Sequence, residues 1–369
     1  MITHTQRVKA ALEGKMLDRP AFAAWGPHMN LVDRNAKDFA RATIDYQNAH
    51  HFDFIKVMPN GMYFPEAFGQ KLKDADFILD ETWQNVQVNA INDPHEWAKL
   101  KVPSMKEGVF AREIEAVKRI ADYFQGDVPV LPTVFSPFIW MGEMTGGFFR
   151  QDTIVAHFKY SEKYARIGLE IVNETNELLM EEFVKAGADG FFLGYQAGMA
   201  GLMGKEMFEE YGKKYDIQNI NKIKDKTWFN MAHICHGDAA LSEWFLDYPV
   251  EAFNWADQYP EHHSLGEMRK LTDKVLIGGL NHSDNGSYKD LSIMIKSPSD
   301  LSGSNRDTIK AHIKKKVYDA VEQAGPKLIV SGGCGWGLGS LPRFSLWEEV
   351  MEEVMKDSAY YRRSGGGLT

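Results

Sequence analysis

Eight short apolar runs, separated by longer stretches with helical spacing, are the feature that most limits how this chain can fold. Each run is apolar at consecutive positions and rich in β-branched or aromatic residues, which is typical of strands buried on both faces of a parallel sheet. The runs are Ala21–Trp25, Phe54–Met58, Val128–Val134, Gly190–Gly194, Trp228–His233, Val250–Trp255, Lys274–Gly279 and Lys327–Gly332.

Amphipathic stretches between these runs, such as Thr153–Ala186 and Asp307–Gln323, have the 3.6-residue spacing of helices. We expect the second stretch to begin at a cap, Asn305 or Asp307, and to stop at Gly325 and Pro326. Eight strands that alternate with helices predict a TIM (β/α)8 barrel of the α/β class. A doubly wound open sheet fits the same alternation and is the alternative.

We interpret residues 1–369 as a single barrel domain with two additions. After the second strand, the connection 60–126 carries two strand-like pieces, Asp76–Leu79 and Asn85–Val88, which predict a hairpin and helix excursion. After the seventh strand, the polar segment Asn281–Asn305 is long enough to be a lid over the strand ends. A plain surface insertion is the alternative for that segment.

Composition and charge exclude several classes of protein. The net charge of −9 offers no basic footprint for nucleic acid or for an anionic membrane surface. Two cysteines in 369 residues exclude a small secreted scaffold held by disulfides. The start has no apolar signal region and no run of 18 apolar residues occurs, so we expect a cytoplasmic protein. Residues 363–369 read as a frayed tail, and the sequence leaves the oligomeric state open.

Both cysteines follow predicted strands, at the end of a barrel where active sites lie. Cys235 follows the fifth strand in the sequence His233-Ile234-Cys235, and Cys334 follows the eighth within a glycine-rich segment. Residues at i and i+2 on a strand point to the same side, so His233 and Cys235 could face one point. Two thiolates and an imidazole suit a tetrahedral zinc ion with one open position. Alternatively, each cysteine is a small buried apolar side chain.

Several segments together give the chain a family resemblance. They are Arg7–Gly14, Asp18–Pro20, Val250–Trp255, Ile277–Leu280 and Val330–Gly335, in addition to the His-x-Cys motif and the distant second cysteine. With these features the chain resembles the uroporphyrinogen decarboxylase superfamily, and within it the zinc-dependent, corrinoid-linked methyltransferase branch. The resemblance extends over most of the chain, but the His-x-Cys…Cys pattern is its specific part.

The resemblance implies a fold, a cofactor, partners and a reaction. In that branch the matching pattern holds a zinc ion, which here implies His233, Cys235 and Cys334 as its ligands. A methylcorrinoid on a partner protein would donate the methyl group. The acceptor would be the thiol of coenzyme M or, as in bacterial relatives, tetrahydrofolate. The sequence does not choose between these acceptors.

Five further residues after predicted strands are candidates for substrate contacts. Asn254 and Asp257 could orient a substrate or the histidine at the metal, or could cap a loop. Tyr195 and Gln196 could bind the acceptor or close a turn, and His28 could contact an acidic group or a pterin.

Two other functions compete with methyl transfer. A metal-independent decarboxylase of the same family needs arginines near the first strand to grip substrate carboxylates, and this chain has none between Pro20 and Arg34. A non-catalytic barrel could instead dock a corrinoid protein and carry a structural zinc. Such a zinc would need a fourth protein ligand, for which His236 or His282 is available.

Overall fold

The computed structural model describes residues 2–26, 32–72, 86–147, 151–196, 201–235, 241–281, 303–335 and 341–357. Eight parallel strands form one curled sheet in the order β1-β10-β9-β8-β7-β6-β5-β2. They are β1 (Ala21–Phe22), β2 (Ile55–Val57), β5 (Val130–Phe135), β6 (Phe192–Gln196), β7 (Met231–Cys235), β8 (Ala252–Asn254), β9 (Val275–Leu280) and β10 (Leu328–Gly332). All eight overlap the predicted apolar runs, with shifts of a few residues at their ends, and the TIM-barrel expectation is confirmed.

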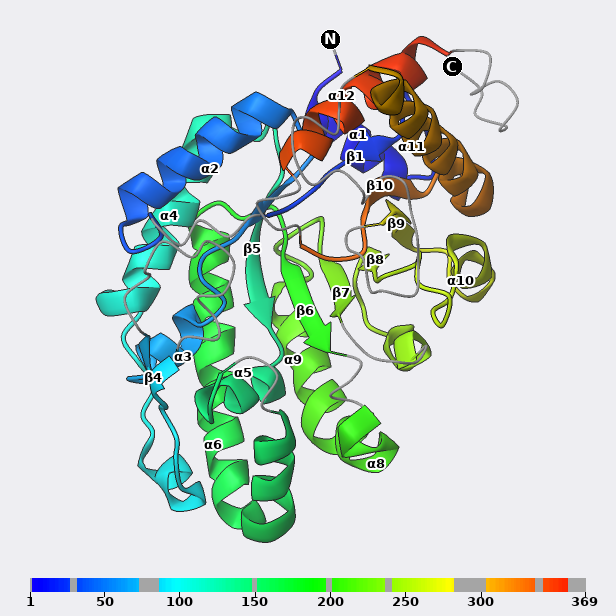
Figure 1. Cartoon of the computed structure of the whole chain (residues 1–369). Helices are drawn as coiled ribbons and strands as arrows, with labels where there is room; N and C mark the ends of the chain where they lie inside the picture. Colours follow the sequence, from blue (N-terminus) through cyan, green and yellow to red (C-terminus); the bar gives the residue numbers. More distant parts are fainter. Residues whose placement is uncertain are drawn as a thin grey trace.

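Helices surround the sheet, and the strands point away from α1 toward the end where α5 lies (Figure 1). The helices are α1 (His4–Leu12), α2 (Ala36–His50), α3 (Tyr63–Ala67), α4 (Gly108–Phe124), α5 (Pro137–Met144), α6 (Gln151–Lys185), α8 (Lys205–Met207), α9 (Lys214–Ile223), α10 (Leu265–Leu271), α11 (Gly303–Ala324) and α12 (Leu341–Lys356). Short helical turns are η2 (Pro94–Lys99), η3 (Phe208–Lys213) and η4 (Leu241–Phe245). No described helix is both long and apolar enough to cross a membrane.

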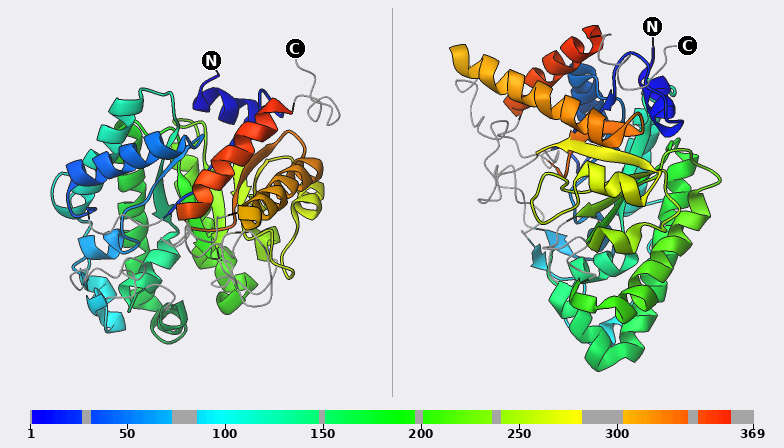
Figure 2. Two further views of the ribbon diagram at one scale, coloured as in Figure 1. Left: turned by 45° about the horizontal axis from the view of Figure 1, so that its top comes forward. Right: turned by 90° about the vertical axis from the view of Figure 1, so that its right-hand side faces the viewer.

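Two long helices differ in detail from their predicted spans. Helix α6 matches the predicted stretch, but its backbone is non-helical at Ser161 (φ −147°, ψ 37°), where it kinks. Helix α11 begins at Gly303, before both expected caps, and ends at Ala324 as expected, where Gly325 takes a positive φ of 68°. Figure 2 shows α11 beside α12, and Lys310 of α11 pairs there with Glu349 and Glu353.

The two predicted additions are described only in part. Strand β4 (Val86–Val88) falls within the expected piece Asn85–Val88, but its antiparallel partner is β3 (Lys71–Leu72), which precedes the other expected piece. The first expected piece, Asp76–Leu79, lies outside the described residues, as do most of segment 281–305 and the whole tail 363–369.

Aromatic side chains fill the inside of the barrel. The ring of Trp25 packs against Phe54 and Phe192 at centroid distances of 6.1 and 5.2 Å, and Phe54 packs against Phe229 at 5.3 Å. Successive side chains alternate across a strand, so the residues next to these inward-facing rings, such as Ile55 and Val57 on β2, face the helices. The barrel interior is therefore a packed core below the strand ends.

The buried carboxylate of Asp53 joins β1 to β2, the two strands at the ends of the sheet order. Its Oδ2 accepts a hydrogen bond from the backbone N–H of Phe22 at 2.7 Å, and the Asp53 N–H donates to the Phe22 carbonyl at 2.7 Å. Two arginines and one histidine surround the same carboxylate: Arg7 at 3.3 Å, Arg19 at 2.5 Å and Nδ1 of His4 at 2.8 Å. Arg7 and Arg19 come from the segments that carry the family resemblance at the start of the chain.

Replacing Asp53 by Asn should destabilise the protein by about 3–5 kcal/mol, because it leaves buried cations without their partner. Burial alone would raise the pKa of Asp53, but the charge of Arg19 and the hydrogen bonds from His4 and Arg19 make the net shift downward. The stabilisation is therefore present above the ordinary aspartate pKa of about 4 and is lost as the pH falls below it. Urea unfolding at several pH values should show a wild-type advantage that narrows in acid.

The matched control is Asp45→Asn, which removes the exposed i,i+4 partner of Arg41. We expect a change within about 0.5 kcal/mol for this variant. Equal stabilities of the Asp53 and Asp45 variants at neutral pH would contradict the role given to the Asp53 cluster.

Candidate metal centre

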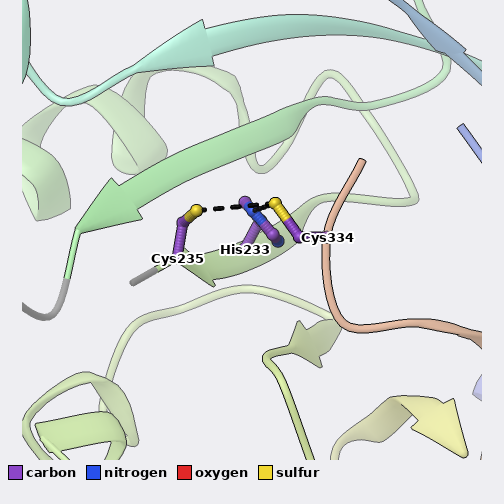
Figure 3. Close-up of side chains that lie close together, drawn as sticks. All are labelled: His233, Cys235 and Cys334. Atoms are coloured by element: carbon purple, nitrogen blue, oxygen red, sulfur yellow. Dashed lines mark hydrogen bonds between the residues drawn. The ribbon is translucent and has the colours of Figure 1, made fainter. Parts of the chain in front are cut away.

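The ends of β7 and β10 bring His233, Cys235 and Cys334 together (Figure 3). Cys235 is the last residue of β7, and Cys334 lies two residues beyond β10. The two Sγ atoms are 3.6 Å apart, and Sγ of Cys334 is 3.7 Å from Nε2 of His233. His233 is buried, whereas both cysteines are partly exposed. Strands β8 and β9 separate β7 from β10 in the sheet, so Cys334 meets the other two residues by reaching across the strand ends.

The spacing of these donor atoms fits a tetrahedral metal ion. Metal–ligand bonds of about 2.0–2.3 Å place neighbouring donors of a tetrahedron roughly 3.5–3.8 Å apart. Both short separations fall in this range, and all three donor atoms lie within 4.8 Å of one another. Among the described residues, no fourth His, Cys, Asp or Glu joins the group. The set can therefore hold a zinc ion through one nitrogen and two sulfurs, with a position left for another ligand.

Asn254, at the end of β8, fixes how the His233 ring presents its nitrogens. Its Nδ2 donates to the carbonyls of Ile277 and Gly332 at 2.8 and 3.0 Å, which leaves Oδ1 as an acceptor. Nδ1–H of His233 donates to that oxygen at 2.5 Å. The lone pair is then on Nε2, the atom that faces Cys334. Hydrogen bonding of this kind sets the tautomer and orientation of metal-binding histidines.

Gly333 allows the segment before Cys334 to approach the segment after β8. A Cβ built at this position would lie 2.4 Å from Cα of Ala256 and 2.9 Å from the carbonyl oxygen of Trp255. Both contacts are with backbone atoms that cannot swing aside, so a side chain at residue 333 would displace Cys334. Gly335 is different, because its nearest neighbour would be Cδ1 of Trp25 at an ordinary 3.7 Å.

Aromatic rings and one lysine surround His233 on the barrel side. Phe192 and Trp25 have ring centroids 4.8 and 6.3 Å from that of His233. The Nζ atom of Lys56, from the middle of β2, lies 3.9 Å from the Phe192 centroid and 5.8 Å from that of Trp25. Burial lowers the pKa of Lys56 to about 8, although negative charge on Cys334 and Cys235 acts in the opposite direction.

Lys56 is a residue that the sequence analysis missed. The signal was present, because a lysine at the centre of the apolar run Phe54–Met58 is unusual for a strand with both faces buried. Its neighbours Ile55 and Val57 face the helices. Because side chains alternate along a strand, Lys56 must point to the inside of the barrel.

Other predicted substrate residues lie elsewhere or are not described. Tyr195 is buried against Phe245 and Tyr248, on the face of β6 opposite to Phe192, so its position is a packing position outside the barrel. Asp257 directs both carboxylate oxygens at the Gly279 N–H, each at 3.1 Å, and burial raises its pKa to about 6. Gln196 pairs with Cys235 through the backbone of β6, and His28 lies outside the described residues.

Comparisons with known proteins give one family match and two informative relatives. The sequence model of the uroporphyrinogen decarboxylase (URO-D) family matches residues 4–285. The chain is 22% identical over 184 residues to the methylcobamide:CoM methyltransferase MtbA of Methanosarcina acetivorans, an alignment that covers 50% of this chain. The matched region spans about half of that relative, 52% of its length.

A solved structure gives the wider similarity in fold. The methyltransferase from Methanosarcina mazei superposes with a TM-score of 0.71 at 16% sequence identity. The superposition covers 96% of this chain and 99% of that chain. At this identity the similarity concerns the fold, and it agrees with the barrel described above.

Replacing Asn254 by Ala should weaken zinc binding about 10- to 100-fold, because the His233 ring loses the partner that fixes its tautomer. Competition with a chromophoric chelator measures this affinity. Asn219→Ala is the control, since Asn219 is equally buried and hydrogen-bonded but bonds to Asn173 and Tyr215. Unchanged zinc affinity in the Asn254 variant would refute the orienting role.

Gly333→Ala should lower zinc occupancy and Gly335→Ala should not, because only the first substitution drives a Cβ into backbone. The two variants differ from the wild type by the same single methyl group, on either side of Cys334. Zinc content after dialysis, with circular dichroism to check folding, measures the effect. Equal zinc content in the two variants would contradict this account of how Cys334 is positioned.

Proposed function

The chain belongs to the uroporphyrinogen decarboxylase family, and on that premise we propose that it is a zinc-dependent methyltransferase. A methylated corrinoid on a separate protein would be the donor, and a small molecule at the mouth of the barrel would be the acceptor. The observation that carries the proposal is the convergence of His233, Cys235 and Cys334 at the ends of β7 and β10. The name of the Methanosarcina acetivorans relative, a methylcobamide:CoM methyltransferase, supports the same chemistry.

The donor set explains why zinc suits the reaction. A free thiol with a pKa of roughly 8.5 is mostly protonated at neutral pH and is then a poor nucleophile. Zinc, when bound, lowers the pKa of a coordinated thiol and offers its sulfur as a nucleophile. The protein contributes two sulfur donors, and Asn254 keeps the lone pair of His233 on Nε2. The aromatic rings of Trp25 and Phe192 shield the buried imidazole from water.

The proposed step is a displacement at the methyl carbon. For a thiol acceptor, the sulfur lone pair forms the new S–C bond while the cobalt–carbon bond breaks and leaves both electrons on the cobalt of the donor. The thiol proton passes to solvent. Tetrahydrofolate would accept the methyl group at a ring nitrogen instead. Because the two partly exposed cysteines lie at the strand ends, the barrel mouth is the face over which a corrinoid protein would dock.

A decarboxylase activity is the less favoured function. Acidic tetrapyrroles need several guanidinium partners, yet Arg19 is engaged with Asp53 and Arg34 pairs with Glu66. A docking barrel with a structural zinc would need a fourth protein ligand, and none joins the cluster among the described residues.

The testing experiment combines metal analysis with a methyl-transfer assay. Purified protein should hold one zinc per chain and should demethylate free methylcobalamin in the presence of coenzyme M or tetrahydrofolate. Cys235→Ala and Cys334→Ala should each lose the zinc and at least about 100-fold of the activity.

His263→Ala is the control, because His263 pairs with Glu243 away from the cluster and its loss should change neither readout. Full methyl transfer by metal-free protein would refute the zinc dependence. A zinc-loaded protein that transfers no methyl group to either acceptor would refute the methyltransferase and favour the docking barrel.

A further inference from the structure

Two thiol groups lie side by side at the candidate metal centre. Cys235 on β7 and Cys334 beyond β10 direct their sulfur atoms toward one another, and the Sγ–Sγ distance is 3.6 Å (Figure 3). A disulfide requires the two sulfurs to approach to about 2 Å. Rotation about its own Cα–Cβ bond moves each sulfur by about 1 Å without any movement of the backbone. The pair is therefore placed to become an intramolecular disulfide.

The chain itself keeps the two thiols together, whether or not a metal is bound. Cys235 is fixed in the sheet, where it pairs with Gln196 of β6. The close packing of Gly333 on the backbone of Ala256 fixes the approach of Cys334 from the other side. Neither contact involves a metal-binding atom, so both remain in the metal-free protein. Groups held next to one another in this way react as though each were present at very high concentration.

Oxidants in the solvent can reach the pair. Both cysteines are partly exposed, whereas His233 beside them is buried. Exposure favours oxidation of a thiol, and a second thiol within reach turns the first oxidation product into a disulfide. The chain has only these two cysteines, so no third thiol competes within one molecule.

We propose that Cys235 and Cys334 are a redox-modification site, at which hydrogen peroxide converts the metal-free protein to an intramolecular disulfide. This reversible modification controls whether the centre takes up zinc. The disulfide follows from the geometry of the two thiols alone, whereas its effect on zinc rests on the proposed function.

The oxidation takes two steps, and peroxide is the oxidant in both. One sulfur attacks a peroxide oxygen, the O–O bond breaks, and a sulfenic acid and one water form. The other sulfur then attacks the sulfenic sulfur, the S–S bond forms as the S–O bond breaks, and a second water leaves. In sum, the two thiols lose two electrons and two protons, and the peroxide that gains them becomes two waters.

Zinc and the disulfide exclude one another. A zinc ion is bound by the deprotonated sulfurs of both cysteines, and these sulfurs lose their charge when they bond to each other. After oxidation, His233 is the single donor left of the three in the cluster. Conversely, sulfurs that are coordinated to zinc have their lone pairs engaged and react more slowly with peroxide.

The first experiment follows the thiols of the metal-free protein. The full chain is stripped of metal with a chelator, reduced, and treated with a small excess of hydrogen peroxide, and its thiols are counted with a chromogenic disulfide reagent. We expect the count to fall from two per chain to none, with a mass lower by about 2 Da, the two hydrogens lost. A thiol reductant should restore both values, and non-reducing electrophoresis should show single chains.

Gly333→Ala and Gly335→Ala are the matched variants for the geometry. The first displaces Cys334 and should form the disulfide about tenfold or more slowly, whereas the second should keep the wild-type rate. Cys235→Ala should gain oxygen instead of losing hydrogen, because the second thiol is missing. Sulfinic acids or linked chains in the wild type, in place of the intramolecular disulfide, would overturn the inference. Equal rates in the two glycine variants would overturn it as well.

The second experiment repeats the treatment on zinc-loaded protein, with a chromogenic chelator to record released zinc. Bound zinc should slow the loss of thiols about tenfold or more, because it holds the protein in the form that does not react. The oxidised protein should take up no zinc until it is reduced. Equal rates of oxidation with and without zinc would overturn the link between the disulfide and zinc loading.

The two experiments separate this inference from the proposed function. A disulfide in a protein that never binds zinc would support the redox site and refute the zinc-dependent reaction. Zinc binding and methyl transfer by a protein whose metal-free form makes no disulfide would refute the redox site and leave the methyltransferase standing.

Discussion

The closure of the sheet at Asp53 is the constraint on which the rest of the structure depends. β1 and β2 are short, and their link in the described residues is the pair of hydrogen bonds between Phe22 and Asp53. Arg7 of α1 and Arg19 of the following segment neutralise the carboxylate that makes this link, and His4 hydrogen-bonds to it. The closure brings Trp25, beyond β1, and Lys56, on β2, to the same side of His233. An ion cluster at one end of the barrel thus determines the surroundings of the candidate metal centre at the other.

Backbone carbonyls, rather than further charged groups, set the orientation of the imidazole. Asn254 binds carbonyls from β9 and β10 with its amide nitrogen and so has only its oxygen to offer His233. The geometry of one side chain on β7 therefore depends on three other strands. Gly333 extends this dependence, because the segment that carries Cys334 packs directly on the backbone after β8.

The sequence predicted the strands well because burial on both faces leaves a continuous apolar run, a signal that needs no tertiary information. It predicted from strand parity that His233 and Cys235 face one point, and the family resemblance implied Cys334 as the third residue; the structure brings all three together. The alternation of side chains along a strand also explains what was missed. Tyr195 faces the helices and Lys56 faces the inside of the barrel, but a run that is apolar almost throughout does not show which side each residue faces. The kink at Ser161 and the reach of Cys334 depend on contacts between distant segments, so local patterns carried no signal for them.

The separation of the site residues along the chain determines when the site can form. Cys235 and Cys334 are 99 residues apart, and β10, which precedes Cys334, pairs with β1 as well as with β9. A chain emerging from the ribosome folds its N-terminal portions first, so the strand that completes the cylinder is also the strand that delivers the last thiol. The complete metal site can consequently form only after the barrel has closed. A chain truncated before β10 would carry two of the three donors on an open sheet.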